Sequence, residues 1–282
     1  MISVIICNRK DKLDPTLEEN IHSTVGVEYE LVAIDNYHGQ YNIFQAYNEG
    51  VRQANGDILC FMHDDVFFLG KDWGKTVEHV FNDETIGALG VDGGHYMPDC
   101  PCSWTSCNTT SFKTFRTNPD GTHTEFNNTA FSNGKHTVEV ASIDGLWMCI
   151  RRSLFDTIRF DDKTFSGFHC YDSDICMQIL TAGYRIMMTY DIDIVHDSHG
   201  TYNEQFFKNI ELWHKKWHTF LPVLRGIDLS EREQQTHLRY AIELMERLHT
   251  ESELYARLNS PEYRIGHFLL KPWRFIKKYI SL

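Results

Sequence analysis

The first hundred residues alternate between apolar runs and segments whose apolar residues recur every three or four positions. A continuous aliphatic or β-branched run is typical of a strand buried on both faces, and helical spacing predicts an amphipathic helix. The alternation therefore predicts an α/β fold, with a mostly parallel central sheet flanked by helices. The expected strands are residues 2–7, 29–34, 57–62 and 86–91.

Polar residues mark where several of the expected helices begin. Asp14 is expected to cap a helix that has Pro15 at its first position. Asp72 is expected to cap the helix that follows it, and Ser230 with Glu233 forms a capping box nearer the C-terminus. Three helix starts are thus predicted from local sequence alone.

The pattern changes after residue 91. Residues 92–140 are rich in Gly, Asn, Thr and Ser, which predicts loops and short antiparallel strands inserted over one edge of the sheet. Helical spacing returns in a C-terminal extension, residues 201–282, which we expect to pack on a domain formed by residues 1–200. The face of this extension that carries Trp213 and Trp217 could be core or a homodimer interface.

Composition narrows the possible partners. The chain has 282 residues and a net charge of −12. Proteins that bind nucleic acid normally present a basic surface, so no nucleic-acid partner is expected. No apolar stretch reaches the roughly 20 residues of a transmembrane helix. The opening sequence MISVIICNRK lacks the pattern of a secretory signal, which favours a cytoplasmic protein.

Because no secretory signal is evident, the eight cysteines are expected in a reducing compartment. Four of them lie in apolar runs, where a free thiol packs like a small apolar group. Three others, Cys100, Cys102 and Cys107, could bind zinc, but their spacing is not that of a common zinc site and no fourth ligand is evident. The four in apolar runs are Cys7, Cys60, Cys149 and Cys176.

Polar clusters follow three of the expected strands, where ligands bind in open α/β sheets. None of these clusters has the Gly-rich pattern of a dinucleotide or P-loop site. The acids after the third strand could hold a divalent cation that bridges to a diphosphate, or they could simply form a turn. The clusters are Cys7-Asn8-Arg9, Asp35-Asn36 and His63-Asp64-Asp65.

Two further clusters lie later in the chain. Asp172 and Asp174 open an expected helix beside His169, where acids are favoured by the helix dipole, but a carboxylate there could also be a general base. His196 and His199 follow another strand-like segment, and either could complete a metal site with Asp65. A lone histidine there could equally be an ordinary surface residue.

Taken together, six segments resemble the family 2 glycosyltransferases of the GT-A fold, which has a Rossmann-like α/β core. They span roughly residues 1–200, and FHCYDSDIC is similar to the streptomycin-biosynthesis-type subgroup. The segments are ISVIICNRK, YELVAIDNY, AYNEGVRQANGDILCFMHDDVFF, SIDGLWMCIRRSLFDTIRFDD, YDSDICMQILTAGYRI and IVHDSHG.

The resemblance implies an inverting transfer of a sugar from a nucleotide-sugar donor, expected to be UDP-linked, to an acceptor hydroxyl. Asp172 would be the general base, and Asp65 with His196 would hold Mn²⁺ or Mg²⁺. The residues implied in nucleotide binding are Cys7, Asn8, Arg9, Asp35, Asn36, His63 and Asp64. Those implied on the acceptor or donor-sugar side are Gly145, Trp147, His169 and Asp174, with core packing as the other interpretation of Trp147.

The sequence departs from the family pattern at three motif positions, and one of them is Tyr47, where an Arg often precedes the Asn. His63 stands where the DxD motif usually has its first Asp, and Tyr171 stands where an acidic pair usually begins. These departures leave open a catalytically inactive nucleotide- or sugar-binding protein of the same fold. A nucleotidyltransferase is the third hypothesis, although that class usually has a Gly-rich phosphate loop.

The resemblance also implies a glycan or lipid-linked acceptor, as in polysaccharide synthesis. The tail GHFLLKPWRFIKKYISL, residues 266–282, mixes apolar, aromatic and basic residues on an otherwise acidic chain. Such a segment could lie on the inner face of an anionic membrane, or it could be a helix packed on its own domain.

Overall fold

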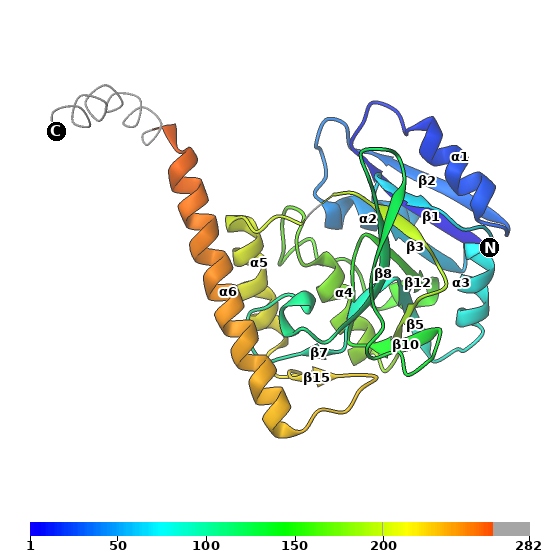
Figure 1. The fold of residues 1–282 in the computed structure, drawn as a ribbon. Coiled ribbons are helices and arrows are strands. Elements are labelled where there is room, and N and C mark those ends of the chain that lie inside the picture. Colours follow the sequence, from blue (N-terminus) through cyan, green and yellow to red (C-terminus); the bar gives the residue numbers. More distant parts are fainter. Residues whose placement is uncertain (199, 262–282) are drawn as a thin grey trace.

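The computed structural model describes residues 1–198 and 200–261, and a seven-stranded sheet forms its centre (Figure 1). The strand order is β10-β13-β5-β12-β3-β1-β2. The bounds are β1 (Ile2–Asn8), β2 (Tyr29–Asp35), β3 (Ile58–Met62), β5 (Ile86–Gly90), β10 (Thr137–Val140), β12 (Trp147–Arg151) and β13 (Arg185–Thr189).

The α/β prediction is confirmed, but the sheet is mixed. Strand β1 runs parallel to β2 and β3, and β13 runs parallel to β5. Strand β12 lies antiparallel between β3 and β5, and β10 is antiparallel at the edge. A parallel neighbour needs a long crossover connection, usually a helix. The chain enters β12 directly from the short β11 (Ser142–Ile143), without a helix between them.

Helices cover both faces of this sheet. On one face, Ile2, Val4 and Ile6 of β1 pack with residues of α1 and α3, and on the other Ile5 and Cys7 pack with residues of α2 and α4. Both faces are therefore apolar, as the continuous hydrophobic runs predict. The helices are α1 (Pro15–Thr24), α2 (Ile43–Gln53), α3 (Trp73–Phe81) and α4 (Tyr171–Thr181).

Two of the three predicted helix caps are present. The Asp14 carboxylate accepts the Thr16 N–H at the start of α1, and Ser230 with Glu233 forms a capping box on α6 (Glu231–Asn259). Asp72 stands at the N-cap position of α3 as predicted, but it does not cap the helix with its side chain. Its backbone is left-handed, with φ of 63°, and its side chain pairs with Lys75.

The insertion contributes β6, β8 and β9 to a second sheet, and these three strands pair antiparallel as predicted. The other strands of this sheet come from outside the insertion, and β14 pairs parallel with β8. The strand order of the second sheet is β11-β6-β8-β14-β4, with β9 paired to β8. This sheet places β14 against β4, which directly follows His63-Asp64-Asp65. The bounds are β4 (Val66–Phe68), β6 (Asp92–Gly94), β8 (Thr110–Thr117), β9 (His123–Asn128) and β14 (Ile194–His196).

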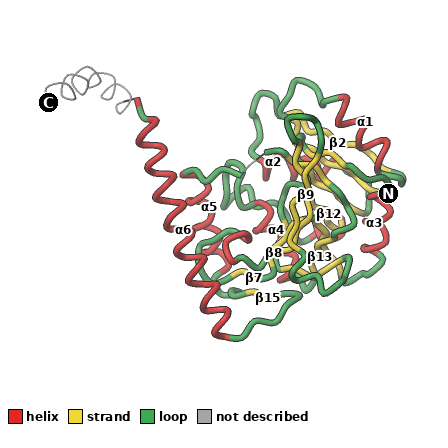
Figure 2. Tube along the Cα trace, in the orientation of Figure 1, coloured by secondary structure: helices red, strands yellow, loops and turns green. Residues whose placement is uncertain are grey.

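The C-terminal part of the described chain is helical, and α6 runs along the outside of α5 (Figures 1 and 2). Trp213 and Trp217 of α5 (Glu204–Trp217) are buried in the main core, so their face is core and not a dimer interface. None of the helices in residues 1–198 and 200–261 is both long and apolar enough to cross a bilayer. The tail 266–282 and His199 lie outside the described residues.

Smaller elements complete the described chain. Strand β7 (Tyr96–Met97) pairs with β15 (Val223–Leu224), and a short 3₁₀ turn, η2 (Arg152–Asp156), follows β12. Another 3₁₀ turn, η1 (Trp104–Cys107), contacts α6. Cys100, Cys102 and Cys107 are free thiols buried there against Ala241 and Met245 of α6.

Candidate active site

A pocket of about 1110 Å³ lies at the carboxyl ends of β1 and β3, between the two sheets and the start of α4. This is the edge at which an open α/β sheet binds ligands. Residues from widely separated parts of the chain line it, including Arg9, His63, Asp172 and His196. All five of the sequence-predicted clusters therefore contribute residues to one cavity.

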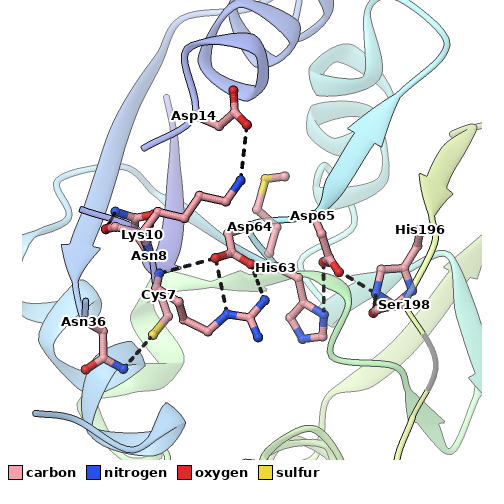
Figure 3. A network of polar contacts seen from close by, with 12 residues as sticks. Cys7, Asn8, Lys10, Asp14, Asn36, His63, Asp64, Asp65, His196 and Ser198 are labelled. Carbon is pink, nitrogen blue, oxygen red and sulfur yellow. Dashed lines mark hydrogen bonds and ion pairs between the residues drawn. The ribbon is translucent and has the colours of Figure 1, made fainter. Parts of the chain in front are cut away.

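Two imidazoles face one carboxylate in this pocket (Figure 3). The Asp65 Oδ1 atom lies 4.0 Å from His63 Nδ1 and 3.7 Å from His196 Nε2. It is buried and accepts no hydrogen bond from any described residue. A buried carboxylate oxygen without a donor is costly unless a cation neutralises it, so this arrangement fits a metal ion.

The two sheets build this triad. His63 directly follows β3, and its backbone N–H donates to the Leu146 carbonyl at 3.0 Å. His196 stands opposite Val66 in the antiparallel pair of β14 and β4. In the described chain, no other His, Cys, Asp or Glu residues bring three ligand atoms within 4.8 Å of one another. The three cysteines Cys100, Cys102 and Cys107 therefore do not form the zinc site considered from their spacing.

The His63 imidazole is held on both sides. Its Nε2 atom lies 2.7 Å from the Tyr171 hydroxyl, and the Phe168 ring lies 5.4 Å from its own ring. Burial lowers the pKa of His63 to about 4, because an apolar environment disfavours the charged imidazolium. The ring is therefore neutral at pH 7, as a metal ligand must be.

Asp64 turns away from the triad and binds Arg9. The Arg9 guanidinium donates to it at 2.5 and 3.3 Å, and the Arg9 backbone N–H donates at 3.3 Å. Burial opposes ionisation of Asp64, but the hydrogen bonds and charge of Arg9 hold its pKa below the ordinary value. Asp64 thus fixes the loop after β1, and Asp65 is the free carboxylate of the motif.

The remaining residues predicted to bind the nucleotide fall into two groups. Cys7 and Asn36 line the pocket, and the Asn36 amide donates to the Cys7 sulfur at 3.4 Å (Figure 3). Asn8 is buried and donates to the Lys10 carbonyl at 2.7 Å, so it shapes the loop. Asp35 is exposed at the end of β2, accepts the Tyr37 N–H, and is not among the pocket-lining residues.

Asp172 lies in the first turn of α4 and lines the pocket. Its carboxylate accepts the Ser173 N–H at 2.7 Å and the Gly145 N–H at 3.3 Å. Burial, reinforced by the charge of Asp144, raises the pKa of Asp172 to about 7. A carboxylate with such a pKa can accept a proton near neutral pH.

Two residues predicted on the sugar side pack elsewhere. Trp147 is fully buried against Phe68 and Trp73, because successive residues of β12 face opposite sides of the sheet and its side chain takes the far one. Asp174 is buried, accepts the Trp217 indole N–H at 2.8 Å, and pairs with Lys216. Asp174 therefore joins α4 to α5. Neither Trp147 nor Asp174 lines the pocket.

The other two residues predicted on that side lie near the pocket. His169 lines it directly. Gly145 borders Tyr171 so closely that a β-carbon would collide with the Tyr171 hydroxyl, and its N–H holds Asp172. Gly145 therefore contributes its backbone and its lack of a side chain.

Sequence reasoning missed two further carboxylates. Asp92 and Asp144 both line the pocket, and burial raises the pKa of Asp92 well above its ordinary value, with the Asp144 charge adding to the effect. Asp92 directly follows the apolar run 86–91, which is the same strand-end signal that pointed to the other clusters. Asp144 precedes the apolar run of β12, where no such signal applies.

Comparisons with known proteins agree with this architecture. The model of a family described as "Glycosyltransferase like family" matches residues 3–216. The streptomycin biosynthesis protein StrF of Streptomyces griseus is 28% identical over 193 residues, which are 66% of this chain and 64% of StrF. The match therefore spans less than two thirds of that relative.

Solved structures show the same fold at low sequence identity. The crystal structure of S. aureus TarS 1-349 has a TM-score of 0.51 and 16% identity, over 86% of this chain and 70% of that one. TarS 1-349 in complex with UDP-GlcNAc has a TM-score of 0.50 and 15% identity, over 84% of this chain and 70% of that one. The predicted GT-A fold is confirmed, and the family match over residues 3–216 shows that this chain belongs to the glycosyltransferase-like family.

Proposed function

We propose that this protein is a metal-dependent, inverting glycosyltransferase that moves a sugar from a nucleotide-sugar donor to a hydroxyl acceptor in glycan or polysaccharide synthesis. One observation carries the proposal. A carboxylate with a pKa of about 7, Asp172, opens into the same pocket as the imidazole–carboxylate triad around Asp65. A base and a cation site are the two groups that such a displacement needs.

Asp65 and His196 would hold the divalent cation, Mn²⁺ or Mg²⁺. The unpartnered Asp65 Oδ1 fits a cation, and the facing His196 Nε2, which lies 2.7 Å from the Ser198 hydroxyl, can exchange that contact for the ion. When bound, such an ion supplies positive charge that stabilises a departing diphosphate. Arg9, held by Asp64, adds a fixed positive charge to the same pocket.

Asp172 would act as the general base. It takes the proton of the acceptor hydroxyl while that oxygen forms a bond to the anomeric carbon of the donor. The bond from that carbon to the phosphate oxygen breaks at the same time, and the nucleoside diphosphate leaves with the electron pair. The N–H groups of Ser173 and Gly145 hold the carboxylate in place for this step.

The nucleotide would lie along the ends of β1 and β2, where Cys7, Arg9 and Asn36 line the pocket. A UDP-linked donor is supported by the fold likeness to TarS, which was solved with UDP-GlcNAc. The contact of Asp35 with the base stays a prediction, because its carboxylate is engaged by the Tyr37 N–H.

His169 and the other residues at the start of α4 would face the acceptor, which we propose is a glycan or a lipid-linked sugar. Contact with the inner face of a membrane through residues 266–282 and homodimer formation both stay predictions. The core position of Trp213 and Trp217 removes the one dimer face that the sequence suggested.

The first experiment is calorimetric binding of UDP and GDP, each with and without Mn²⁺, to the wild type and to Asp65→Asn. We expect Mn²⁺-dependent binding of UDP in the wild type and its loss in the variant. Asp120→Asn, an exposed carboxylate in the turn between β8 and β9, is the matched control and should bind like the wild type. Absence of any nucleoside diphosphate binding by folded, Mn²⁺-loaded protein would contradict the proposal.

The second experiment separates an enzyme from a binding protein of the same fold. UDP-sugars are screened for release of UDP in the presence of candidate acceptors, and Asp172→Asn is then assayed with the active pair. We expect turnover to fall by about 10²–10⁴-fold, the usual contribution of a general base, while UDP binding is retained. Turnover that survives this substitution would show that Asp172 is not the base.

A further inference from the structure

Two of the three motif departures in this sequence, His63 and Tyr171, meet in space. His63 and Tyr171 are 108 positions apart, yet His63 Nε2 and the Tyr171 hydroxyl lie at a hydrogen-bond distance of 2.7 Å. The first stands at the DxD motif after β3, and the second stands at the start of α4. Both substitutions therefore belong to one local arrangement.

The second ring nitrogen of His63 faces the candidate cation site. Nδ1 lies 4.0 Å from Asp65 Oδ1, while Nε2 is taken by Tyr171. When Nδ1 gives its lone pair to a cation, the ring proton is on Nε2, which then donates it to the Tyr171 oxygen. Metal-binding histidines are usually oriented by a hydrogen bond of this kind from the other ring nitrogen.

Tyr171 is held rigidly enough to orient the imidazole. It is 4% exposed, and its ring packs against Tyr47 at 5.6 Å and Phe44 at 6.3 Å between ring centroids. Gly145 leaves the space that the hydroxyl occupies, because a β-carbon at that position would overlap it. The hydroxyl cannot move far without displacing the core behind it.

The candidate ligand atoms of His63, Asp65 and His196 lie at nearly the distances from one another that binding of one ion requires. Ligands about 2.1 Å from an ion lie about 3.0–3.5 Å from one another, and the two imidazole nitrogens lie 4.0 and 3.7 Å from Asp65 Oδ1. Small side-chain rotations would close the difference. Two imidazoles and one carboxylate suit transition ions, whereas Mg²⁺ prefers a set of oxygen ligands.

We propose that His63 is a third metal ligand, that Tyr171 is its positioning residue, and that the site selects an imidazole-accepting ion such as Mn²⁺ over Mg²⁺. This inference rests on the proposed metal-dependent function and names the ion class and the residues that select it. The histidine and the tyrosine then act as one unit in place of the two acidic residues expected at their motif positions.

The test is binding of Mn²⁺ by electron paramagnetic resonance titration, with and without UDP, and with Mg²⁺ as competitor. Tyr171→Phe removes only the hydroxyl and should weaken Mn²⁺ binding by about tenfold or more, as loss of a ligand-orienting bond does. Tyr47→Phe is the matched control. Tyr47 is also a buried tyrosine and packs on the ring of Tyr171, but the hydroxyl that is hydrogen-bonded to His63 belongs to Tyr171. Equal Mn²⁺ affinity in the Tyr171→Phe variant and the wild type would overturn the positioning role.

A second pair of variants tests the ligand itself. His63→Asp should narrow the preference for Mn²⁺ over Mg²⁺, since a carboxylate replaces an imidazole. In that background, Tyr171→Phe should no longer weaken Mn²⁺ binding, because the hydrogen bond that it removes is already gone. Unchanged selectivity in His63→Asp, with a circular dichroism spectrum like that of the wild type, would overturn the assignment of His63 as a ligand.

These outcomes separate the inference from the proposed function. If the wild type binds neither Mn²⁺ nor Mg²⁺ in the presence of UDP, metal dependence itself is wrong. A different result overturns only the inference. In that case the wild type binds Mn²⁺ and Asp65→Asn does not, but Tyr171→Phe and His63→Asp both bind Mn²⁺ with wild-type affinity and selectivity.

Discussion

At the scale of single residues, the surroundings of Asp172 decide its chemistry. A carboxylate in the first turn of a helix is favoured in its charged form by the helix dipole. Here burial, and then the neighbouring Asp144, outweigh that effect and raise the pKa to about 7. The group is therefore protonated below neutral pH and becomes a base as the pH rises through this value.

This pKa predicts the pH dependence of turnover. We expect the rate to rise with pH along a limb whose midpoint lies at about 7, the pKa of Asp172. Asp144→Asn removes the second cause of the raised pKa and should move the midpoint to lower pH. The measurement is a pH profile of kcat/KM. Asp120→Asn should leave the midpoint in place, and a profile that Asp144→Asn does not move would contradict this account.

The same carboxyl predicts a pH dependence of stability. Its pKa is raised in the folded protein, so the stability that it contributes is fully present below the unfolded value of 3.8 and is lost as pH rises through about 7. Asp172→Asn should therefore gain stability relative to the wild type as pH rises across this range, with no further change above it. Urea unfolding at several pH values measures the difference, and a constant difference across the range would refute the buried-carboxyl explanation.

At the scale of elements, contacts between helices and strands assign roles that motifs cannot. Asp174 and Asp172 are two positions apart in α4, yet one faces α5 and the other faces the pocket. Strand β14 acquires its part in the site only by pairing with β4, which brings His196 to Asp65. The elements thus position the site through their packing.

The packing role of Asp174 predicts a loss of stability without a specific loss of substrate binding. Asp174→Ala leaves the buried Trp217 indole N–H without its acceptor and should cost about 1–3 kcal/mol of unfolding free energy. Urea unfolding gives the cost, and calorimetry on the folded variant should give wild-type UDP affinity. Asp228→Ala, at an exposed carboxylate in the segment before α6, serves as the control. A raised KM with unchanged stability would instead place Asp174 on the sugar side.

At the scale of the whole molecule, the pocket is assembled from distant segments. Its aromatic lining includes three side chains that are more than a third exposed, Tyr41, Phe168 and Tyr202. They come from the loop after β2, the loop before α4 and the segment before α5. Exposed aromatic rings in a polar cavity suit the apolar face of a sugar.

This aromatic lining predicts that one of its residues contributes to binding of the sugar and not to binding of the nucleotide. Tyr202→Ala should raise the KM for a sugar substrate by about fivefold, which corresponds to about 1 kcal/mol of ring contact. UDP binding and unfolding free energy should change little. Phe220→Ala is the control, because that ring is 54% exposed but does not line the pocket. Equal effects of the two substitutions would show that Tyr202 has no special role.

Local patterns along the chain determined much of this protein. Apolar runs predicted four of the seven strands of the central sheet, and the polar residues at the ends of two of them predicted Cys7, Arg9 and Asp65 near one another. These predictions succeed because a buried strand needs a continuous apolar run and because parallel strands end at a common edge. The family resemblance, confirmed by the match over residues 3–216, extended them to Asp172.

Only the tertiary structure decided which side chains share the pocket. Both faces of the sheet are apolar, so the sequence could not say that Trp147 faces Trp73 and not the pocket. Nothing local distinguishes Asp172 from Asp174 before α5 packs on α4. The contact of His63 with Tyr171 likewise requires the whole fold, because residues 108 positions apart meet only when β3 and α4 reach the same edge of the sheet.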